Sequence, residues 1–146
     1  MSKKYQVNRQ VRFVNRIMAR LIRWNLAPPR TYLMTVYGRK TGQPYTTPVT
    51  LIERDGNRWL VSPYGEVSWV KNARAAGEVN LFRNGKTETL KIRKLGPQES
   101  APILKEYITR QAVVRPYFDA QLDSSLETFE AETAQHPVFI LGVQGA

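Results

Sequence analysis

The chain has no cysteine and a single histidine, His136, among its 146 residues. Disulfides, thiolate nucleophiles, iron–sulfur ligation and cysteine-based zinc sites are therefore excluded, and one imidazole cannot build a histidine metal cluster. We accordingly expect no metal site, and we interpret His136, which stands just before a proline, as structural. A cysteine-free chain also fits a reducing compartment, so we expect a cytoplasmic protein.

Acidic residues are missing from the first third of the chain. Residues 1–52 contain 10 of the 22 Lys and Arg, whereas the first carboxylate is Glu53. The other 94 residues carry 12 basic and 12 acidic groups, so the front third holds the whole net charge of +10. This asymmetry favours an anionic partner: a phosphorylated ligand, an acidic membrane or nucleic acid.

Long apolar runs are also missing. No segment approaches the ~20 apolar residues that span a bilayer, and arginines interrupt the N-terminal apolar positions, which argues against a secretory signal. Apolar residues from about 6 to 26 nevertheless recur at helical spacing, and Pro28 and Pro29 follow them. The pattern predicts a basic amphipathic helix within residues 1–28, stopped by the prolines. Packing on the core and attachment to the inner face of an anionic membrane are both open for this helix.

The rest of the chain alternates strand signals with tight turns. β-Branched and aromatic segments predict about six strands, at residues 31–37, 45–52, 58–62, 78–83, 86–94 and 137–143. Asn84 and Gly85 give a strong two-residue hairpin signal. Helices are expected at 68–76, capped by Ser68 and ended by Gly77, at 98–111 and at 122–134. We therefore expect one α+β, mainly β domain over residues 1–146, an antiparallel barrel with helices packed on it.

The segment from Gly38 to Val49 carries the clearest chemical signal. Two glycines permit close approach of the backbone to a ligand, Arg39 and Lys40 supply charge, and hydroxyls come from Thr41, Thr46 and Thr47. Phosphate groups bind to this mixture of donors. The glycine spacing fits neither a Walker loop nor a Rossmann fingerprint. An ordinary hairpin with surface cations is the alternative interpretation.

The residues Gly-Arg-Lys-Thr-Gly-Gln-Pro at 38–44, followed by Thr-Thr-Pro-Val at 46–49, resemble the deazaflavin-dependent nitroreductase family, which uses coenzyme F-420. Trp69, Val70, Lys71 and Asn72 resemble the second signature of that family. The similarity extends from about residue 31 to 143. It implies a split β-barrel of the flavin-reductase kind, and a reductase that transfers a hydride from the reduced deazaflavin to an activated double bond, a quinone or a nitro compound.

The resemblance also implies the coenzyme-binding residues. The first signature implies contacts to the phosphate side, and the turn at 61–64 together with 68–72 implies a lining for the deazaflavin ring. The expected set is Arg39, Lys40, Thr41, Gly42, Gln43, Pro44, Thr46, Thr47, Val61, Ser62, Pro63, Tyr64, Ser68, Trp69, Val70, Lys71 and Asn72. This chain departs from many relatives in having Tyr45 at a position where they have arginine, and it has Thr128 and Phe129 where some relatives place tyrosines over the ring.

A bound deazaflavin carries the hydride, so the protein needs neither a metal nor a nucleophile. Tyr64 and Tyr117 are the candidates for proton donation or substrate contact, and Trp69 and Phe118 are further candidates for aromatic walls. The signature residues all lie beyond Arg30, so the coenzyme contacts are not expected to need the front helix. The expected partners are an apolar electron acceptor and, through residues 1–28, an anionic membrane surface; a homodimer follows by analogy with other split barrels.

Two alternatives remain from the sequence. One is a split barrel that binds flavin mononucleotide (FMN) or haem. The other is a non-catalytic protein that binds a membrane surface or nucleic acid through its basic front third. Nucleic acid is not expected, because the cations lie on one helix and one hairpin without interleaved aromatic residues.

Overall fold

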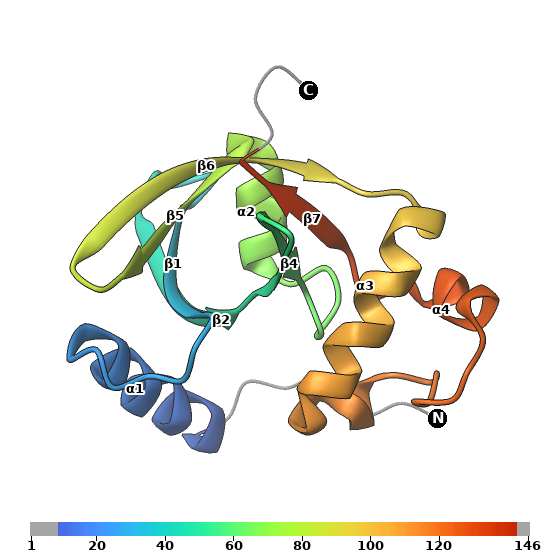
Figure 1. The fold of residues 1–146 in the computed structure, drawn as a ribbon. Coiled ribbons are helices and arrows are strands. Elements are labelled where there is room, and N and C mark those ends of the chain that lie inside the picture. Colours follow the sequence, from blue (N-terminus) through green and yellow to red (C-terminus); the bar gives the residue numbers. More distant parts are fainter. Residues whose placement is uncertain (1–8, 143–146) are drawn as a thin grey trace.

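The computed structural model describes residues 9–142, and within them one seven-stranded sheet has the order β2-β1-β5-β6-β7-β4-β3. Every strand pair is antiparallel. The strands are β1 Thr31–Tyr37, β2 Pro44–Thr50, β3 Ile52–Arg54, β4 Asn57–Val61, β5 Glu78–Arg83, β6 Lys86–Lys94 and β7 Val138–Leu141. Figure 1 shows the sheet curling into a barrel.

Barrel closure follows from a single residue between β2 and β3. These strands stand at the two ends of the sheet order, yet only Leu51 separates them in the sequence. The sheet must therefore curve until its two edges meet. Leu51 is 1% exposed, and its N–H donates to the Arg30 carbonyl at 2.9 Å. The expected mainly β barrel is confirmed, but the strand predicted at 45–52 is divided at this residue.

The first helix, α1 (Arg9–Arg23), ends earlier than the sequence suggests. Asn25 takes a positive φ of 59°. The Asn25 N–H donates to the Ile22 carbonyl at 3.1 Å, and the Leu26 N–H donates to the Leu21 carbonyl at 2.8 Å. These two bonds form a Schellman motif. The expectation that Pro28 and Pro29 stop the helix is therefore wrong, and residues 6–8 of the predicted helix lie outside the described residues.

The second helix, α2 (Ser68–Ala76), has the predicted bounds and ends at Gly77, whose φ is 76°. Ser68 is not its cap, because Val67 occupies the N-cap position and no side chain accepts a hydrogen bond there. Asn84 and Gly85 both have positive φ, as the predicted hairpin turn requires.

The remaining helices pack together on one side of the barrel. They are α3 (Pro97–Arg110), the short 3-10 helix η1 (Ala112–Tyr117) and α4 (Leu126–Glu132). The helix α4 is shorter than the predicted 122–134, because Ser125 caps it by accepting from the Thr128 N–H at 3.3 Å. No pattern in the sequence predicts η1. The last strand ends at Leu141, and Val143 lies outside the described residues.

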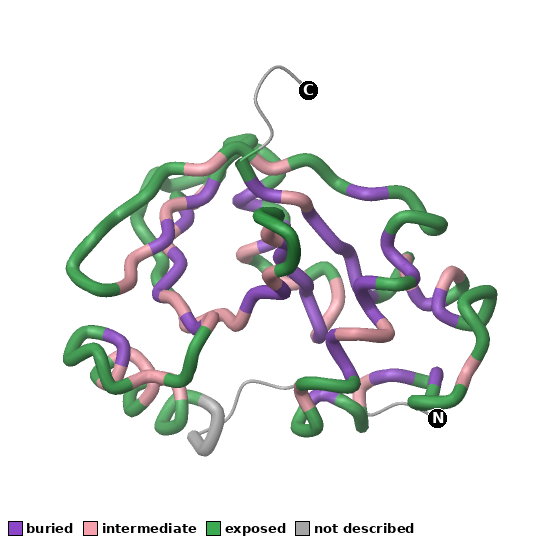
Figure 2. The backbone as a smooth tube through the Cα atoms, viewed as in Figure 1, coloured by how far each residue is buried: buried purple, intermediate pink, exposed green. Residues whose placement is uncertain are grey.

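Residues 59–61 of β4 and most of β7 are buried (Figure 2). Alternate residues of a strand point to opposite faces. Leu60 and Phe139 therefore pack inside the barrel with Val70 of α2, whereas Trp59 and Val138 belong to a second core beneath α3 and α4. Two cores on either side of one sheet hold both helix layers in place.

Arg83 ties the segment after α1 to the barrel. Its Nη1 donates to the carbonyls of Pro28 at 2.9 Å and Thr31 at 2.6 Å, and its guanidinium lies over the Tyr32 ring. Together with the buried Ile22, this contact fixes α1 beside β1 and β2 (Figure 1). In residues 9–142, no helix is long and apolar enough to cross a membrane.

Replacement of Leu51 should destabilise the protein strongly. We expect Leu51→Ala to lower the free energy of unfolding by about 2–5 kcal/mol, because it opens a cavity at the closure of the barrel. Leu122→Ala is the matched control, since that side chain is 43% exposed, and it should cost less than about 1 kcal/mol. Urea unfolding of both variants measures the difference; equal losses would contradict this role of Leu51.

Candidate functional site

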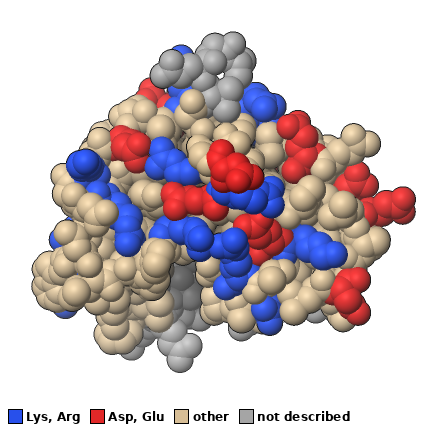
Figure 3. Space-filling model, viewed as in Figure 1, with Lys and Arg blue, Asp and Glu red and all other residues tan. Residues whose placement is uncertain are grey.

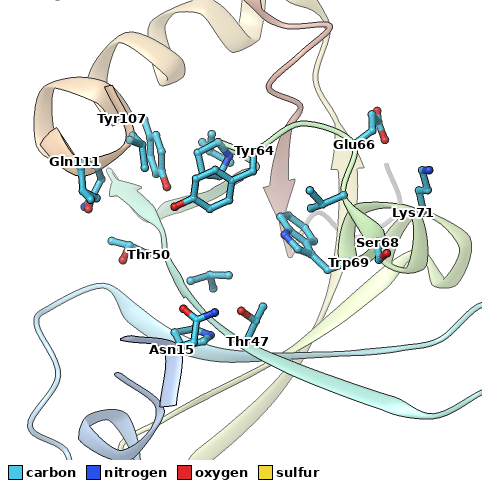
Figure 4. A pocket seen from close by; sticks show the side chains of 17 residues that line it. Asn15, Thr47, Thr50, Tyr64, Glu66, Ser68, Trp69, Lys71, Tyr107 and Gln111 are labelled. Carbon is cyan, nitrogen blue, oxygen red and sulfur yellow. The ribbon is translucent and has the colours of Figure 1, made fainter. Parts of the chain in front are cut away.

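Two adjoining hollows open between the barrel and the helices. The main cavity has a volume of about 600 Å³, and the smaller one, beside the loop of residues 38–43, has about 330 Å³. Ser68 and Trp69 line both, so the two hollows meet at the start of α2. Figure 4 shows the main cavity, which is lined by Asn15, Thr47, Pro48, Val49, Thr50, Val61, Pro63, Tyr64, Glu66, Val67, Ser68, Trp69, Lys71, Tyr107, Gln111, Val113 and Val114.

The 38–43 loop is fastened to α2 by Asn72. The Asn72 side chain is buried, with 5% of the residue exposed. Its Oδ1 accepts from the Arg39 backbone N–H at 3.0 Å and from Arg39 Nη1 at 2.8 Å. Arg39 and Asn72 belong to the two separate sequence signatures, and this contact brings the signatures together.

The turn itself is closed by short-range hydrogen bonds. The Gly38 N–H donates to the Gln43 carbonyl at 2.8 Å, and Thr41 Oγ1 accepts from the Gln43 N–H at 3.2 Å. A Cβ on Gly38 would lie 2.8 Å from Thr41 Oγ1 and 3.0 Å from Tyr45 Cε2. A side chain at position 38 would therefore displace Thr41 or the Tyr45 ring.

The smaller hollow is suited to an anion. Among the described residues, Arg39 and Lys40 are its only charged lining residues, and Thr41, Ser68 and Asn72 add polar groups. Both cations are exposed, so they remain able to contact a ligand from solvent. Tyr45 lines this hollow as an aromatic wall, where an arginine would have added a further cation.

The main cavity is aromatic and has phenol groups on its wall. Trp69, Tyr64 and Tyr107 point into it (Figure 4). Tyr107 is 6% exposed, and burial, with a smaller contribution from Tyr64, raises its pKa well above the usual range. Its hydroxyl therefore stays protonated at physiological pH and can donate a hydrogen bond.

The structure brings most of the sequence-predicted site residues to the two hollows. Around the smaller hollow are Arg39, Lys40, Thr41 and Asn72. On the wall of the main cavity are Thr47, Val61, Pro63, Tyr64 and Lys71, and Ser68 and Trp69 contact both. Gly42, Gln43 and Pro44 shape the loop and the start of β2 without lining either hollow.

Three other predicted residues point away from both hollows because they bond or pack elsewhere in the barrel. Thr46 lies on the opposite face of β2 from Thr47, and its hydroxyl is 2.8 Å from that of Thr35. Ser62 is fully buried and donates to the Gly65 carbonyl at 2.6 Å, and Val70 belongs to the barrel core.

Two of the predicted aromatic residues stand behind the cavity. Tyr117 packs edge-on against Tyr64, with ring centroids 4.9 Å apart, rather than lining the cavity. Phe118 stacks on His136, with ring centroids 3.8 Å apart. Both therefore support the residues of the wall.

Sequence reasoning missed the residues that α1, α3 and η1 contribute, which are Asn15, Tyr107, Gln111, Val113 and Val114. Helices at the positions of α1 and α3 were predicted from the sequence, whereas η1 was not. Nothing in a single sequence indicates which face of a helix reaches a cavity formed by strands far away in the chain. Tyr107 places a phenol on the cavity wall. The segment before the last strand, where some relatives have tyrosines, has Thr128 and Phe129 instead.

His136 lies in a buried cluster that supports the turn at residues 62–64. Its Nε2 is 3.3 Å from Glu132 Oε2, and Glu132 Oε1 accepts from the N–H groups of Asp119 and Ala120. Burial lowers the pKa of His136, while Glu132 and nearby backbone groups partly offset that shift. The histidine is therefore buried and structural, in line with its interpretation from the sequence. No cluster of three or more His, Cys, Asp or Glu that could hold a metal occurs within residues 9–142.

Comparison with solved structures shows the same fold in distant relatives. The chain is 21% identical to the F-420-dependent reductase FDR-A, covering 77% of this chain and 94% of that one, with a TM-score of 0.53. A structure described as a domain-swapped dimer is 18% identical over 90% of this chain and 98% of that one, with a TM-score of 0.55. A protein of unknown function from Agrobacterium tumefaciens is 20% identical over 80% of this chain, which spans 49% of that chain, with a TM-score of 0.53. No curated protein matches the chain.

The antiparallel barrel and the helices packed on it have the split-barrel fold of these structures. The model of the F-420H(2)-dependent quinone reductase family matches residues 4–127, and the chain belongs to that family. It is an oxidoreductase that uses coenzyme F-420. The resemblance identified from the two signatures is confirmed.

Stability should depend on pH through His136. Because its pKa is lowered in the folded state, the unfolded chain takes up a proton more readily, and protonation favours unfolding. The free energy of unfolding should therefore fall as pH drops below the ordinary imidazole pKa of 6.5. In His136→Gln this part of the acid dependence should disappear, whatever the change in stability at pH 8. Urea unfolding between pH 8 and pH 5 measures both curves, and parallel curves would disprove the assignment.

Proposed function

We propose that the phosphate-bearing chain of coenzyme F-420 binds at the 38–43 loop and that its deazaflavin ring occupies the main cavity beside Trp69. The observation that carries this proposal is the junction of the two hollows at Ser68 and Trp69. An anionic tail and a flat ring joined in one molecule require a cationic pocket and an aromatic pocket that are continuous. FMN shares this general shape, but the family match favours the deazaflavin.

The residues around the smaller hollow fit the anionic part of the coenzyme. Lys40 and the part of the Arg39 guanidinium not bonded to Asn72 offer charged donors. Charge-assisted hydrogen bonds of this kind contribute about 1.5–3 kcal/mol each. Asn72 acts by holding Arg39 and the loop backbone in place for this contact.

The main cavity orients the ring and excludes water. Trp69 and Tyr64 give flat aromatic surfaces, and Val61 and Pro63 close the floor behind them. When bound, the reduced deazaflavin supplies the hydride. The acceptor also takes up a proton, and the Tyr64 and Tyr107 hydroxyls on the cavity wall are the phenols in position to donate a hydrogen bond to it.

We infer that the acceptor is a quinone, as the family description indicates. An activated double bond or a nitro compound is the alternative for the same cavity. The mixture of apolar walls and neutral hydroxyls suits a planar, uncharged ring with oxygen substituents. Glu66 and Lys71, the two charged residues of the lining, carry opposite signs, so the wall as a whole favours neither a cationic nor an anionic acceptor.

We further propose that α1 attaches the protein to an anionic membrane surface, where apolar acceptors dissolve. Phe13 and Ile17 are 64% and 43% exposed along one side of α1, and Trp24, directly after the helix, is 66% exposed. Four exposed arginines flank them, at 12, 16, 20 and 23. Figure 3 shows no acidic atoms over α1, whereas acidic and basic groups alternate across the rest of that face. An apolar ridge beside arginines is typical of a helix that lies in a membrane interface.

Loss of the loop cations should weaken coenzyme binding more than it slows the reaction at saturation. We expect Lys40→Ala to raise the dissociation constant of oxidised F-420 about tenfold. Arg39→Ala should have a larger effect, because it also removes the bond from Arg39 Nη1 to Asn72 Oδ1. The rate with naphthoquinone at saturating coenzyme should change little, since these contacts are remote from the hydride.

Lys86→Ala is the matched control, since this exposed cation lies on the β5–β6 hairpin outside both hollows. Deazaflavin fluorescence measures binding, and FMN serves as a parallel ligand. Equal binding of FMN, or no change in either loop variant, would contradict the placement of the coenzyme.

The membrane proposal predicts salt-sensitive binding of the full chain to anionic vesicles. At about 1 kcal/mol per engaged cation, four arginines give measurable cosedimentation at low salt. Phe13→Glu combined with Trp24→Glu should abolish it, because both side chains are exposed and their replacement spares the core. Leu122→Glu is the control. If the wild type does not bind vesicles, α1 has no membrane role. If the double glutamate variant converts a dimer to a monomer, the exposed apolar side chains contact a second copy of the chain instead.

A further inference from the structure

The front helix contributes a side chain to the main cavity. Asn15 lies two helical turns before Ile22 and therefore on the same face of α1. Ile22 is 1% exposed and anchors that face to the barrel. Figure 4 shows the Asn15 carboxamide in the cavity below Tyr64, beside Thr47. The apolar ridge at Phe13 and Ile17 is on a different face, so α1 has separate surfaces for the cavity and for solvent.

The position of Asn15 is determined by the barrel. The Schellman motif at Asn25 stops the helix, and Arg83 holds the following segment through the Pro28 and Thr31 carbonyls. With the end of α1 fixed in this way and Ile22 buried beside it, the helix axis has a defined direction. Asn15 is consequently a wall residue of the cavity.

The Asn15 carboxamide has no hydrogen-bond partner among the described residues, and neither has the side chain of Gln111, which reaches the same cavity from α3. Much of the surrounding wall is apolar, including Val49, Val61 and Val114. Both residues are half-exposed, so a ligand that fills the cavity displaces solvent from these amides, and an acceptor atom on the ligand must replace the lost hydrogen bonds. Two such amides on opposite helices provide four N–H donors.

We propose that Asn15, with Gln111 opposite, donates a hydrogen bond to a carbonyl oxygen of the electron acceptor and so selects carbonyl-bearing acceptors. This inference rests on the proposed function. A carbonyl oxygen only accepts hydrogen bonds, and its electron density rises as the ring is reduced, so a fixed neutral donor binds it more strongly as the reaction proceeds. Sites built to hydrogen-bond a substrate discriminate strongly against an analogue that lacks the bonding group.

The proposal changes the role expected for the front helix. The coenzyme contacts lie beyond Arg30, as the sequence indicates, but acceptor choice involves residue 15. Removal of residues 1–28 would therefore alter acceptor preference while leaving the coenzyme site in place.

The test compares two acceptors of similar size, a 1,4-naphthoquinone and a phenazine dye, whose acceptor nitrogens are part of the ring and do not project from it as a quinone oxygen does. In Asn15→Leu we expect the KM for the naphthoquinone to rise about tenfold, with kcat/KM for the phenazine and the dissociation constant of oxidised F-420 unchanged. Asn15→Gln retains the amide and should recover part of the loss. Gln98→Leu is the control, since it makes the same change at an exposed position of α3 outside the cavity.

Equal losses with both acceptors, or weaker coenzyme binding in Asn15→Leu, would show a merely structural role and overturn the proposal. An unchanged KM for the naphthoquinone would overturn it as well. A second readout separates this inference from the proposed function: quenching of tryptophan fluorescence by the naphthoquinone, without coenzyme. If the wild type does not catalyse quinone reduction, the proposed function fails. The amide contact is still supported if the naphthoquinone quenches Asn15→Leu less than Gln98→Leu, and it is refuted if quenching is equal in the two variants.

Discussion

The arrangement of the molecule depends on the closure of the sheet at Leu51. Because one buried residue links the two edge strands, β2 cannot leave β1 and β3 cannot leave β4 without opening the barrel. Closure brings the end of β2, with Thr47 and Thr50, next to the turn at 62–64 and the start of α2. The main cavity exists because these segments, remote in the sequence, meet there.

A second contact of comparable importance joins Arg39 to Asn72. It fixes a loop that has little other tertiary support, and it does so from a buried amide on a helix packed in the barrel core. The two sides of the smaller hollow differ in chemistry: the 38–43 loop provides the charged side chains, and α2 provides the aromatic wall at Trp69. The aromatic and hydroxyl groups of the main cavity suit a reaction in which the coenzyme carries the hydride.

The helices outside the barrel complete the cavity. The helices α3 and α4 pack on the outer face of β4 and β7, and the end of α3 contributes Tyr107 and Gln111 to the wall. Behind that wall, the buried His136 and Glu132 support the turn that bears Tyr64. Residues that never contact a ligand thus determine where the phenol and amide groups stand.

The sequence by itself determined the local elements and the composition of the loop. β-Branched and aromatic segments predicted the strands, and Gly77 predicted the end of the helix at 68–76. The Asn84-Gly85 pair predicted a hairpin, and the two signatures predicted the coenzyme. These features depend on residues close together in the chain, or on a motif that repeats in a family. Tertiary structure alone decided that β2 and β3 lie at opposite ends of the sheet, that Thr46 and Val70 point away from the site, and that Asn15 and Tyr107 point into it. The direction in which a side chain points depends on how separate elements pack against one another, and a single sequence does not encode that packing in any local pattern.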